Sequence, residues 1–200
     1  MSPLKKLLHR VASNPRVFDW IQRSLGLEHT HRRLTPYLSR TDKQVVLDIG
    51  AGTGNFSTLI PESATHLALD IDLKRLRALK AKHPSSAVIV CDATAICLRQ
   101  KSVDHAVCIA LAHHLSDAQL PLLFSELARV TKQRLVFLDP VECNDSQISS
   151  LLWKYDRGSY PRLAEALCAA IEPWFQTERI ERYAIFHRYL MFVGRPRPRT

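Results

Sequence analysis

Residues Val45–Phe56 read VVLDIGAGTGNF, an apolar run that leads through an acid into three closely spaced glycines. A short apolar run bounded by glycines is typical of a buried strand that enters a tight turn. Such strand-to-helix turns let the backbone approach a nucleotide closely. The spacing Gly50-x-Gly52-x-Gly54 differs from the G-x-G-x-x-G of dinucleotide sites, and no Gly-Lys-Ser/Thr follows as in a P-loop. The stretch therefore predicts a cofactor loop that belongs to neither of these two types.

Acids also close the next two apolar runs. Asp70 lies near the end of Thr65–Asp72, roughly 20 residues after the loop, where a strand-end carboxylate accepts hydrogen bonds from ribose hydroxyls. Asp92 closes Ala87–Asp92, and a fourth apolar run covers Val103–Leu111. Taken singly, each acid is explained as well by a turn or a helix N-cap. Their even spacing after the glycine loop predicts one cofactor site along the strand ends.

The glycine spacing and the leading acid Asp48 resemble motif I of the class I S-adenosylmethionine-dependent methyltransferases, small-molecule enzymes similar to the quinone-methylating group. The resemblance covers residues 45–140 and implies S-adenosyl-L-methionine as cofactor. It places Asp92 near the exocyclic amine of adenine and the Ala93 amide near a ring nitrogen. The expected cofactor-binding residues are Asp48, Gly50, Ala51, Gly52, Gly54, Asp70, Ile71, Asp92, Ala93 and Ala110.

The alternation of strands and helices predicts an α/β fold, with a Rossmann-like parallel sheet and helices on both faces. A fifth strand is expected at Arg134–Asp139, and two final strands, Arg179–Phe186 and Arg188–Gly194, must pair as an antiparallel hairpin. This matches the seven-stranded methyltransferase fold, in which the last strand inserts beside the fifth. Residues Gly54–Leu59 are expected to open the first core helix. Further helices are expected at Leu73–Lys82, with Asp72 as its N-cap, at Ala118–Val130 and at Tyr160–Trp174.

A chain of 200 residues with 46% hydrophobic content is long enough for one α/β core. We expect an N-terminal helical cap over residues 1–40, a cofactor-binding methyltransferase domain over 41–194, and a disordered basic tail over 195–200. Helices at Pro3–Val11 and Arg16–Leu25 would form the cap. In the family such additions pack over the cofactor cleft, although a pair capping the sheet edge or a peripheral membrane contact also fits.

The formal net charge of +9 is concentrated at the two ends, because residues 1–40 carry +6, residues 179–200 carry +5 and the middle carries −2. Basic ends attract RNA, an anionic membrane surface or an acidic substrate, or simply aid solubility. No apolar run approaches the roughly 20 residues that cross a bilayer, and no signal peptide is evident. Five cysteines without a C-x-x-C pair indicate reduced, mostly structural thiols and no metal site, as in a cytoplasmic protein.

The sulfonium methyl group is already activated, so the enzyme has mainly to align it with a nucleophile and exclude water. A hydroxyl or carbon acceptor also needs a proton removed, and His114 is the predicted general base because it follows the fourth strand and titrates near neutral pH. Packing against the next helix explains this histidine equally well. The predicted substrate-binding residues are His113, Tyr155, Arg157 and Tyr160, in or near a segment that also fits a salt-bridged turn.

The fourth strand is not followed by the Asn/Asp-Pro-Pro-aromatic motif, and no Pro-Cys nucleophile occurs, which counts against methylation of DNA bases. The sequence therefore predicts methyl transfer to a small organic acceptor, lipid-like molecules included. Two alternatives stay open: an RNA methyltransferase that uses the basic termini, and a cofactor-binding protein without catalytic activity.

Overall fold

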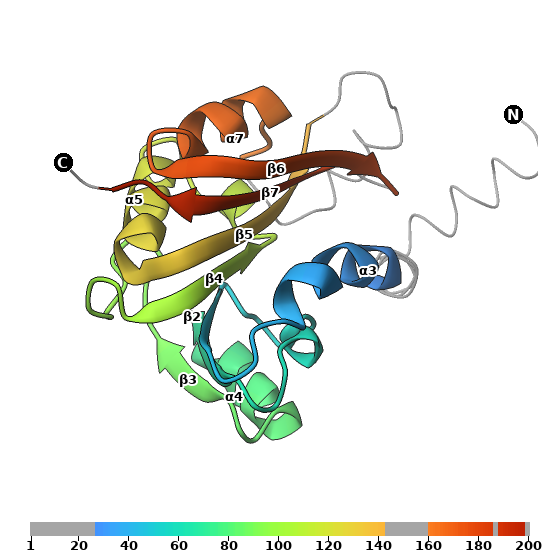
Figure 1. Ribbon diagram of the computed structural model, residues 1–200, viewed down its shortest axis with the longest axis vertical. Coiled ribbons are helices and arrows are strands. Elements are labelled where there is room, and N and C mark those ends of the chain that lie inside the picture. Colours follow the sequence, from blue (N-terminus) through green and yellow to red (C-terminus); the bar gives the residue numbers. More distant parts are fainter. Residues whose placement is uncertain (1–26, 143–159, 186–187, 199–200) are drawn as a thin grey trace, which may run out of the picture.

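The computed structural model describes residues 27–142, 160–185 and 188–198. Seven strands form one sheet in the order β3-β2-β1-β4-β5-β7-β6 (Figure 1). The parallel strands are β1 (Val45–Ile49), β2 (Thr65–Asp70), β3 (Ala87–Val90), β4 (Val103–Ile109) and β5 (Thr131–Val141). The antiparallel hairpin consists of β6 (Phe175–Ala184) and β7 (Arg188–Pro196), and β7 lies beside β5. The predicted fold class and the insertion of the last strand are therefore confirmed.

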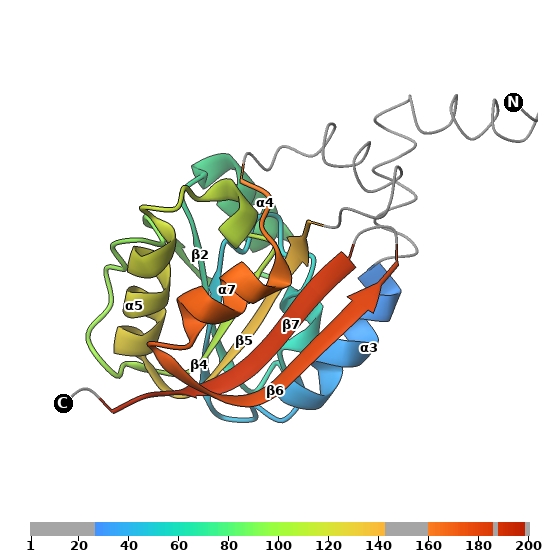
Figure 2. The ribbon, with the colours of Figure 1, turned by 90° about the horizontal axis from the view of Figure 1, so that it is seen from above.

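Helices cover both faces of this sheet (Figures 1 and 2). On one face lie α5 (Leu120–Val130) and α7 (Ala164–Ile171), and on the other lie α3 (Leu27–Leu38) and α4 (Leu73–Lys82). Successive side chains of a strand point to opposite faces. Cys108 of β4 accordingly packs with the α5 side, whereas Val107 packs with the α3 side.

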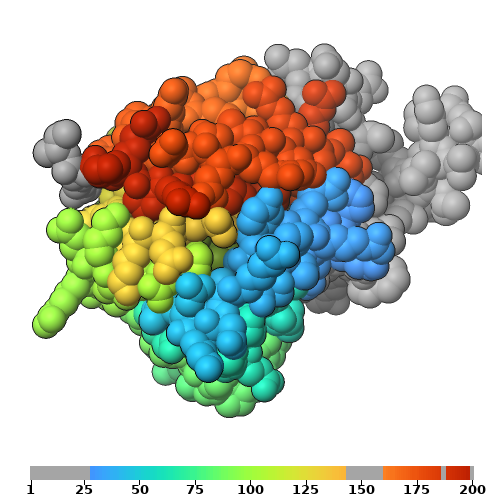
Figure 3. Space-filling model, viewed as in Figure 1, coloured from blue at the N-terminus to red at the C-terminus, as the bar shows by residue number. Residues whose placement is uncertain are grey.

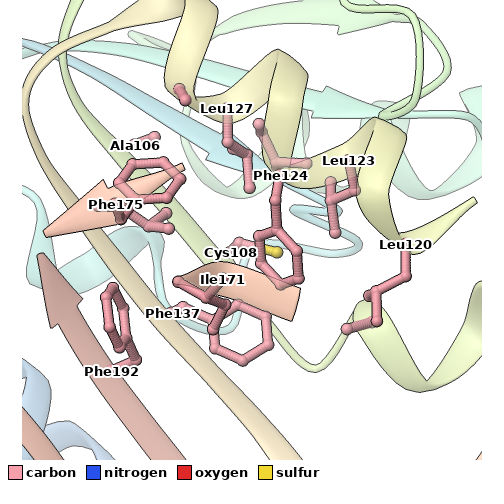
Figure 4. Close-up of a cluster of buried hydrophobic side chains, with 14 of the residues drawn as sticks. Ala106, Cys108, Leu120, Leu123, Phe124, Leu127, Phe137, Ile171, Phe175 and Phe192 are labelled. Carbon is pink, nitrogen blue, oxygen red and sulfur yellow. The ribbon is translucent and has the colours of Figure 1, made fainter. Parts of the chain in front are cut away.

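The larger core lies between the sheet and the pair α5 and α7 (Figure 4). Phe124 and Phe137 meet edge to face with ring centroids 5.4 Å apart, and Phe175 and Phe192 do so at 6.4 Å. All four rings are fully buried, and truncation of one such side chain typically costs about 3–5 kcal/mol. This core fixes β5 and the hairpin, and with them one side of the edge where the parallel strands end.

The helix expected to begin at Gly54–Leu59 is reduced to a single turn of 3-10 helix, η2 (Ser57–Leu59). Ile60 is already extended, Pro61 follows it, and β2 begins at Thr65. Proline lacks the amide that would continue the helix, and too few residues remain for further turns. The prediction of a first core helix at this position was therefore wrong.

Helix α3 supplies the missing cover on that face, with Leu34 and Leu38 buried among residues of the sheet and η2. It also lies against the hairpin (Figure 3). There Arg33 Nε donates to Glu181 Oε1 at 2.7 Å. This helix falls within the span expected as an N-terminal cap, but it packs in the core of the sheet domain. The helices predicted at Pro3–Val11 and Arg16–Leu25 lie outside the described residues.

Several boundaries differ from the expected ones by a few residues. Helix α7 is shorter than Tyr160–Trp174, since Pro161 favours an extended conformation for the residue before it. Strand β7 continues through Arg195 and Pro196, which were expected in the disordered tail. Within the described parts of the chain, no helix combines the length and apolar character needed to cross a membrane.

Candidate active site

The glycine loop follows β1 at the edge of the sheet where the parallel strands end. Gly50, Gly52 and Gly54 have φ angles of +69°, +55° and +81°, a region that favours glycine over residues with a side chain. The amides of Gly50 and Ala51 donate to the carbonyl of Leu69 at 2.8 and 3.1 Å. These two bonds tie the loop to the end of β2.

The space around each glycine separates a packing role from a ligand role. A Cβ on Gly50 would lie 3.1–3.2 Å from Leu111, and one on Gly54 would lie 3.0–3.1 Å from three side-chain atoms. A Cβ on Gly52 would have nothing closer than the Gly50 carbonyl oxygen at 3.9 Å. Gly52 therefore borders open space beside backbone amides, a cradle into which part of a cofactor fits.

Acidic side chains stand at the ends of the strands on both sides of this cradle. Asp70 is buried at the end of β2, with its oxygens on the amides of Gly52 and Asp72, at 2.9 and 2.8 Å. Asp48, at the end of β1, is also buried, and one of its oxygens lies 3.7 Å from His66 Nε2. Each carboxylate oxygen has two lone pairs, so Asp70 can accept ribose hydroxyls beside its backbone donors.

The expected adenine side of the site is more open. Asp92 is exposed beyond the end of β3, where its carboxylate accepts from the amide and the hydroxyl of Thr94, both at 2.8 Å. Ile71 is 72% exposed at the end of β2. Ala110 adopts a φ of +53° after β4, an unusual conformation for a residue with a side chain and one that is often found at functional sites. All ten expected cofactor residues follow or end the strands β1 to β4 at one edge of the sheet.

Asp139 organises the segment that follows β4. It is fully buried in β5, and its Oδ2 accepts from the amides of Leu111 and Ala112 at 3.0 and 2.7 Å. Its Oδ1 lies 2.8 Å from Nδ1 of His113, which is also buried. The carboxylate thus fixes the orientation of the histidine ring and the backbone of η3 (Ala112–His114) at once.

Three of the residues predicted for chemistry or substrate binding lie together. The ring of His114, the predicted general base, is exposed, with its centroid 4.1 Å from that of His113. The amide of Tyr160 donates to the His113 carbonyl at 3.0 Å. Tyr155 and Arg157 lie outside the described residues.

Arg162 performs a structural role next to this group. Its guanidinium is 9% exposed and donates to the carbonyls of Ala112 and Leu115 at 3.0 and 2.7 Å and to Asp117 Oδ1. Arg162 is the last residue of the segment Tyr155–Arg162, for which the sequence allowed either substrate binding or a salt-bridged turn. For Arg162 the structure supports the salt-bridged turn.

A cleft of about 520 Å³ opens at the same edge of the sheet, between the start of α7 and the hairpin. Tyr183 and Tyr189 are among its lining residues, but their rings stack on the α3 face of the sheet, with centroids 5.3 Å apart and with Arg33 over the Tyr183 ring at 4.1 Å. Burial raises the pKa of the Tyr183 phenol. The polar groups of its lining include Glu142 and Arg182. Sequence reasoning did not assign the hairpin residues to the site, because an alternating strand pattern does not distinguish a cleft wall from an ordinary sheet face.

A glycine loop and strand-end carboxylates on a seven-stranded sheet of this order define a methyltransferase of the Rossmann-like type. Residues 46–134 match the family model described as "Methyltransferase domain". Over 115 residues the chain is 36% identical to the biotin biosynthesis bifunctional protein BioHC of Cellvibrio japonicus (strain Ueda107), with 56% of this chain and 22% of that protein aligned. Over 159 residues it is 30% identical to the tRNA (carboxymethyluridine(34)-5-O)-methyltransferase of Arabidopsis thaliana, with 76% of this chain and 36% of that protein aligned.

Among solved structures, the fold is similar to that of the magnesium protoporphyrin IX methyltransferase of Synechocystis PCC 6803 with bound S-adenosylhomocysteine. The TM-score is 0.67 at 16% identity, over 84% of this chain and 81% of that one. Residues 46–134 therefore carry a methyltransferase domain, and the fold is that of solved S-adenosylmethionine-dependent methyltransferases, as the resemblance in sequence implied. The chain spans well under half the length of the two curated relatives.

Proposed function

We propose that this protein transfers the methyl group of S-adenosylmethionine to a small organic acceptor bound in the cleft between α7 and the hairpin. The observation that carries this proposal is the cleft itself, whose volume of about 520 Å³ is typical of sites for small molecules. Glu142 and Arg182 in its lining offer polar groups that would fix the orientation of a ligand.

The cofactor would occupy the cradle of the glycine loop. In this arrangement the open space over Gly52 takes the methionine part, Asp70 accepts the ribose hydroxyls, and Ile71 with the turn of Asp92 and Ala93 holds the adenine. The cofactor supplies an activated methyl group when bound. The chain then has to orient the acceptor and exclude water from the reacting pair.

Proton removal from the acceptor is assigned to His114. This ring is the exposed member of the histidine pair, so it is accessible to a ligand at the end of β4. His113 is buried with its Nδ1 on Asp139, and it supports the neighbouring ring as a positioning residue. A histidine suits this role because its unperturbed pKa lies near neutrality.

RNA is the second candidate acceptor, and the tRNA methyltransferase among the relatives favours it. The charges of the described C-terminal region argue against it. Arg134 and Arg195 both pair with Glu178, Arg179 pairs with Glu181, and Arg182 pairs with Glu165. Three of the six arginines of residues 179–200 are therefore paired with glutamates within the protein and are less available to phosphates.

Incubation of the purified protein with cell extract and isotope-labelled S-adenosylmethionine, followed by mass spectrometry, tests the proposal. Label in a small molecule is the expected result. Label in RNA, with binding that weakens steeply as salt rises, would establish the second candidate instead. Binding of S-adenosylhomocysteine without any labelled product from diverse extracts would favour a cofactor-binding protein without catalytic activity.

A further inference from the structure

Two cysteines meet across the turn that follows β3. Cys91 comes directly after the strand, and its Sγ accepts a hydrogen bond from the amide of Cys97 at 3.2 Å. The Cys91 thiol donates to the carbonyl of Ala95 at 3.3 Å. The two sulfur-bearing side chains are thus neighbours in space.

Both arms of this turn are anchored to regular structure. The amide of Cys91 donates to the Asp70 carbonyl at 3.2 Å, which continues the pairing of β3 with β2. On the other arm, the amide of Ile96 donates to Glu126 Oε2 at 2.8 Å, and Arg129 Nη2 donates to the Ile96 carbonyl at 2.8 Å. A disulfide requires Cβ atoms within about 4.5 Å of each other. Because the Cys97 amide lies 3.2 Å from the Cys91 sulfur, the two side chains are close enough for a bond to form after local adjustment of the turn.

The two thiols differ in accessibility. Cys97 is exposed, whereas Cys91 is half-buried. Burial raises the pKa of the Cys91 thiol, and the neighbouring Cys97 and Asp92 raise it further. Among the other cysteines that the structure describes, Cys108 is fully buried and Cys168 is partly buried. Cys97 is therefore the thiol that a dissolved oxidant reaches first.

We propose that Cys91 and Cys97 form a reversible disulfide in response to peroxide, and that this bond lowers the affinity of the protein for its cofactor. The Cys97 thiolate attacks the O–O bond and takes one oxygen, which gives a sulfenic acid and releases water after protonation. The Cys91 sulfur then attacks the sulfenic sulfur, an S–S bond forms, and hydroxide leaves and is protonated to a second water. Two thiols are oxidised and one peroxide is reduced; a dithiol reductant reverses the change.

The effect on the cofactor rests on the function proposed above, because Asp92 and Ala93 lie between the two cysteines. Formation of the disulfide removes the Cys91 proton and with it the hydrogen bond to the Ala95 carbonyl. The amide of Ala95 itself donates to the carbonyl of Asp92 at 3.1 Å, so the loss acts on the turn that carries the adenine contacts. Loss of about one hydrogen bond corresponds to roughly three- to tenfold weaker binding.

The test treats the full-length protein with hydrogen peroxide, maps its cysteines by peptide mass spectrometry and measures S-adenosylhomocysteine binding by calorimetry. The oxidised wild type should yield a linked Cys91–Cys97 peptide and bind the ligand roughly three- to tenfold more weakly, with recovery after dithiothreitol. The variant Cys97→Ser should bind normally before and after peroxide. The matched control Cys168→Ser should respond like the wild type.

Absence of the linked peptide would overturn the disulfide, and a linked peptide with unchanged affinity would overturn its effect on the cofactor. An equal loss of affinity in oxidised Cys97→Ser would assign the effect to another residue and overturn the proposal as well. Failure of the reduced wild type to bind S-adenosylhomocysteine would instead contradict the proposed function and, with it, the cofactor part of this inference. The peptide map tests the disulfide independently of cofactor binding.

Discussion

The carboxylate of Asp70 and the amide of Gly52 are joined by a hydrogen bond of 2.9 Å, so the residue expected to bind ribose also shapes the loop expected to hold the methionine part. The second oxygen of Asp70 accepts from the amide of Asp72, where α4 begins. A single buried side chain therefore connects two halves of the cofactor site. Variants of Asp70 must consequently be judged on stability and on affinity together.

Asp70→Ala should weaken the binding of S-adenosylhomocysteine by roughly ten- to a hundredfold, because the charge-assisted hydrogen bonds to the ribose hydroxyls are lost. It should also lower the free energy of unfolding by about 2–3 kcal/mol, because the bonds to the amides of Gly52 and Asp72 are lost as well. Asp72→Ala is the control: its carboxylate caps α4 through the amides of Lys74 and Arg75. That change should cost about 1 kcal/mol of stability and little affinity. Calorimetry measures the affinity, and urea unfolding measures the stability. A larger loss of affinity in Asp72→Ala than in Asp70→Ala would assign the ribose contact to Asp72.

Gly52→Ala should lower cofactor affinity as well as stability. The new methyl group meets no protein atom closer than 3.9 Å, but it enters the cradle, and a φ of +55° adds strain of about 1–2 kcal/mol. Calorimetry should show at least tenfold weaker binding of S-adenosylhomocysteine, because the methyl group occupies space that the ligand needs. Binding equal to that of the wild type would show that the ligand does not lie over Gly52.

His114→Gln should lower kcat about a hundredfold, the usual contribution of a general base, and leave cofactor binding unchanged. Asp139→Asn should lower kcat and also destabilise the fold by about 1–3 kcal/mol, because a neutral amide replaces the charge-assisted bonds to the amides of Leu111 and Ala112 and puts an NH2 group where an acceptor now faces His113. Labelled S-adenosylmethionine and the acceptor identified above provide the assay. An unchanged kcat in His114→Gln would remove this residue from the chemistry.

Arg162→Lys should destabilise the protein by about 2–3 kcal/mol, since one ammonium group cannot replace a planar fork that binds two carbonyls and a carboxylate. Asp117→Asn is the matched control, because Asp117 is 92% exposed and its ion pair is screened by water. Urea unfolding should separate the two variants clearly. Similar stabilities for both would show that Arg162 is dispensable for this turn.

His105 makes stability depend on pH. Burial lowers the pKa of this histidine below its usual value of 6.5, and the charge of Arg134 lowers it further. The unfolded chain therefore binds more protons below about pH 6.5, and stability falls as the pH decreases toward about 5. His105→Gln, which can still bond to Gln44, should lose less stability over this range than the wild type. Parallel pH dependences for the two proteins would contradict this assignment.

The sequence was sufficient to predict the elements whose signals are local. The glycine loop follows from residues within one turn, and Asp70 and the N-cap Asp72 follow from their places at the end of an apolar run. The hairpin follows from two adjacent strands that have no room for a crossover. Each of these features is determined by residues close to it in the sequence, and the structure has them where they were expected.

The remaining features depend on contacts between distant parts of the chain. Asp139 and His113 are 26 residues apart and meet only because β4 and β5 are neighbours. Cys91 and Cys97 lack the usual two-residue spacing of a thiol pair, and an irregular turn brings them together. Helix α3 contains a proline, Pro36, in its last turn, so a local helix propensity does not predict it well. The helix is stabilised by its packing on the sheet rather than by its own propensity.

The contact between α3 and the hairpin also limits how early the chain can reach its final structure. Arg33 and Glu181 are separated by 148 residues, so this contact cannot form before the last strands have left the ribosome. Until then the face that holds Val46, Val107 and Val136 lacks part of its cover. Pairing over such distances is slow, and uncovered apolar faces associate with one another in the meantime. Synthesis in cells lacking chaperones should therefore yield more aggregate, and removal of the last two strands should leave a chain that does not remain soluble.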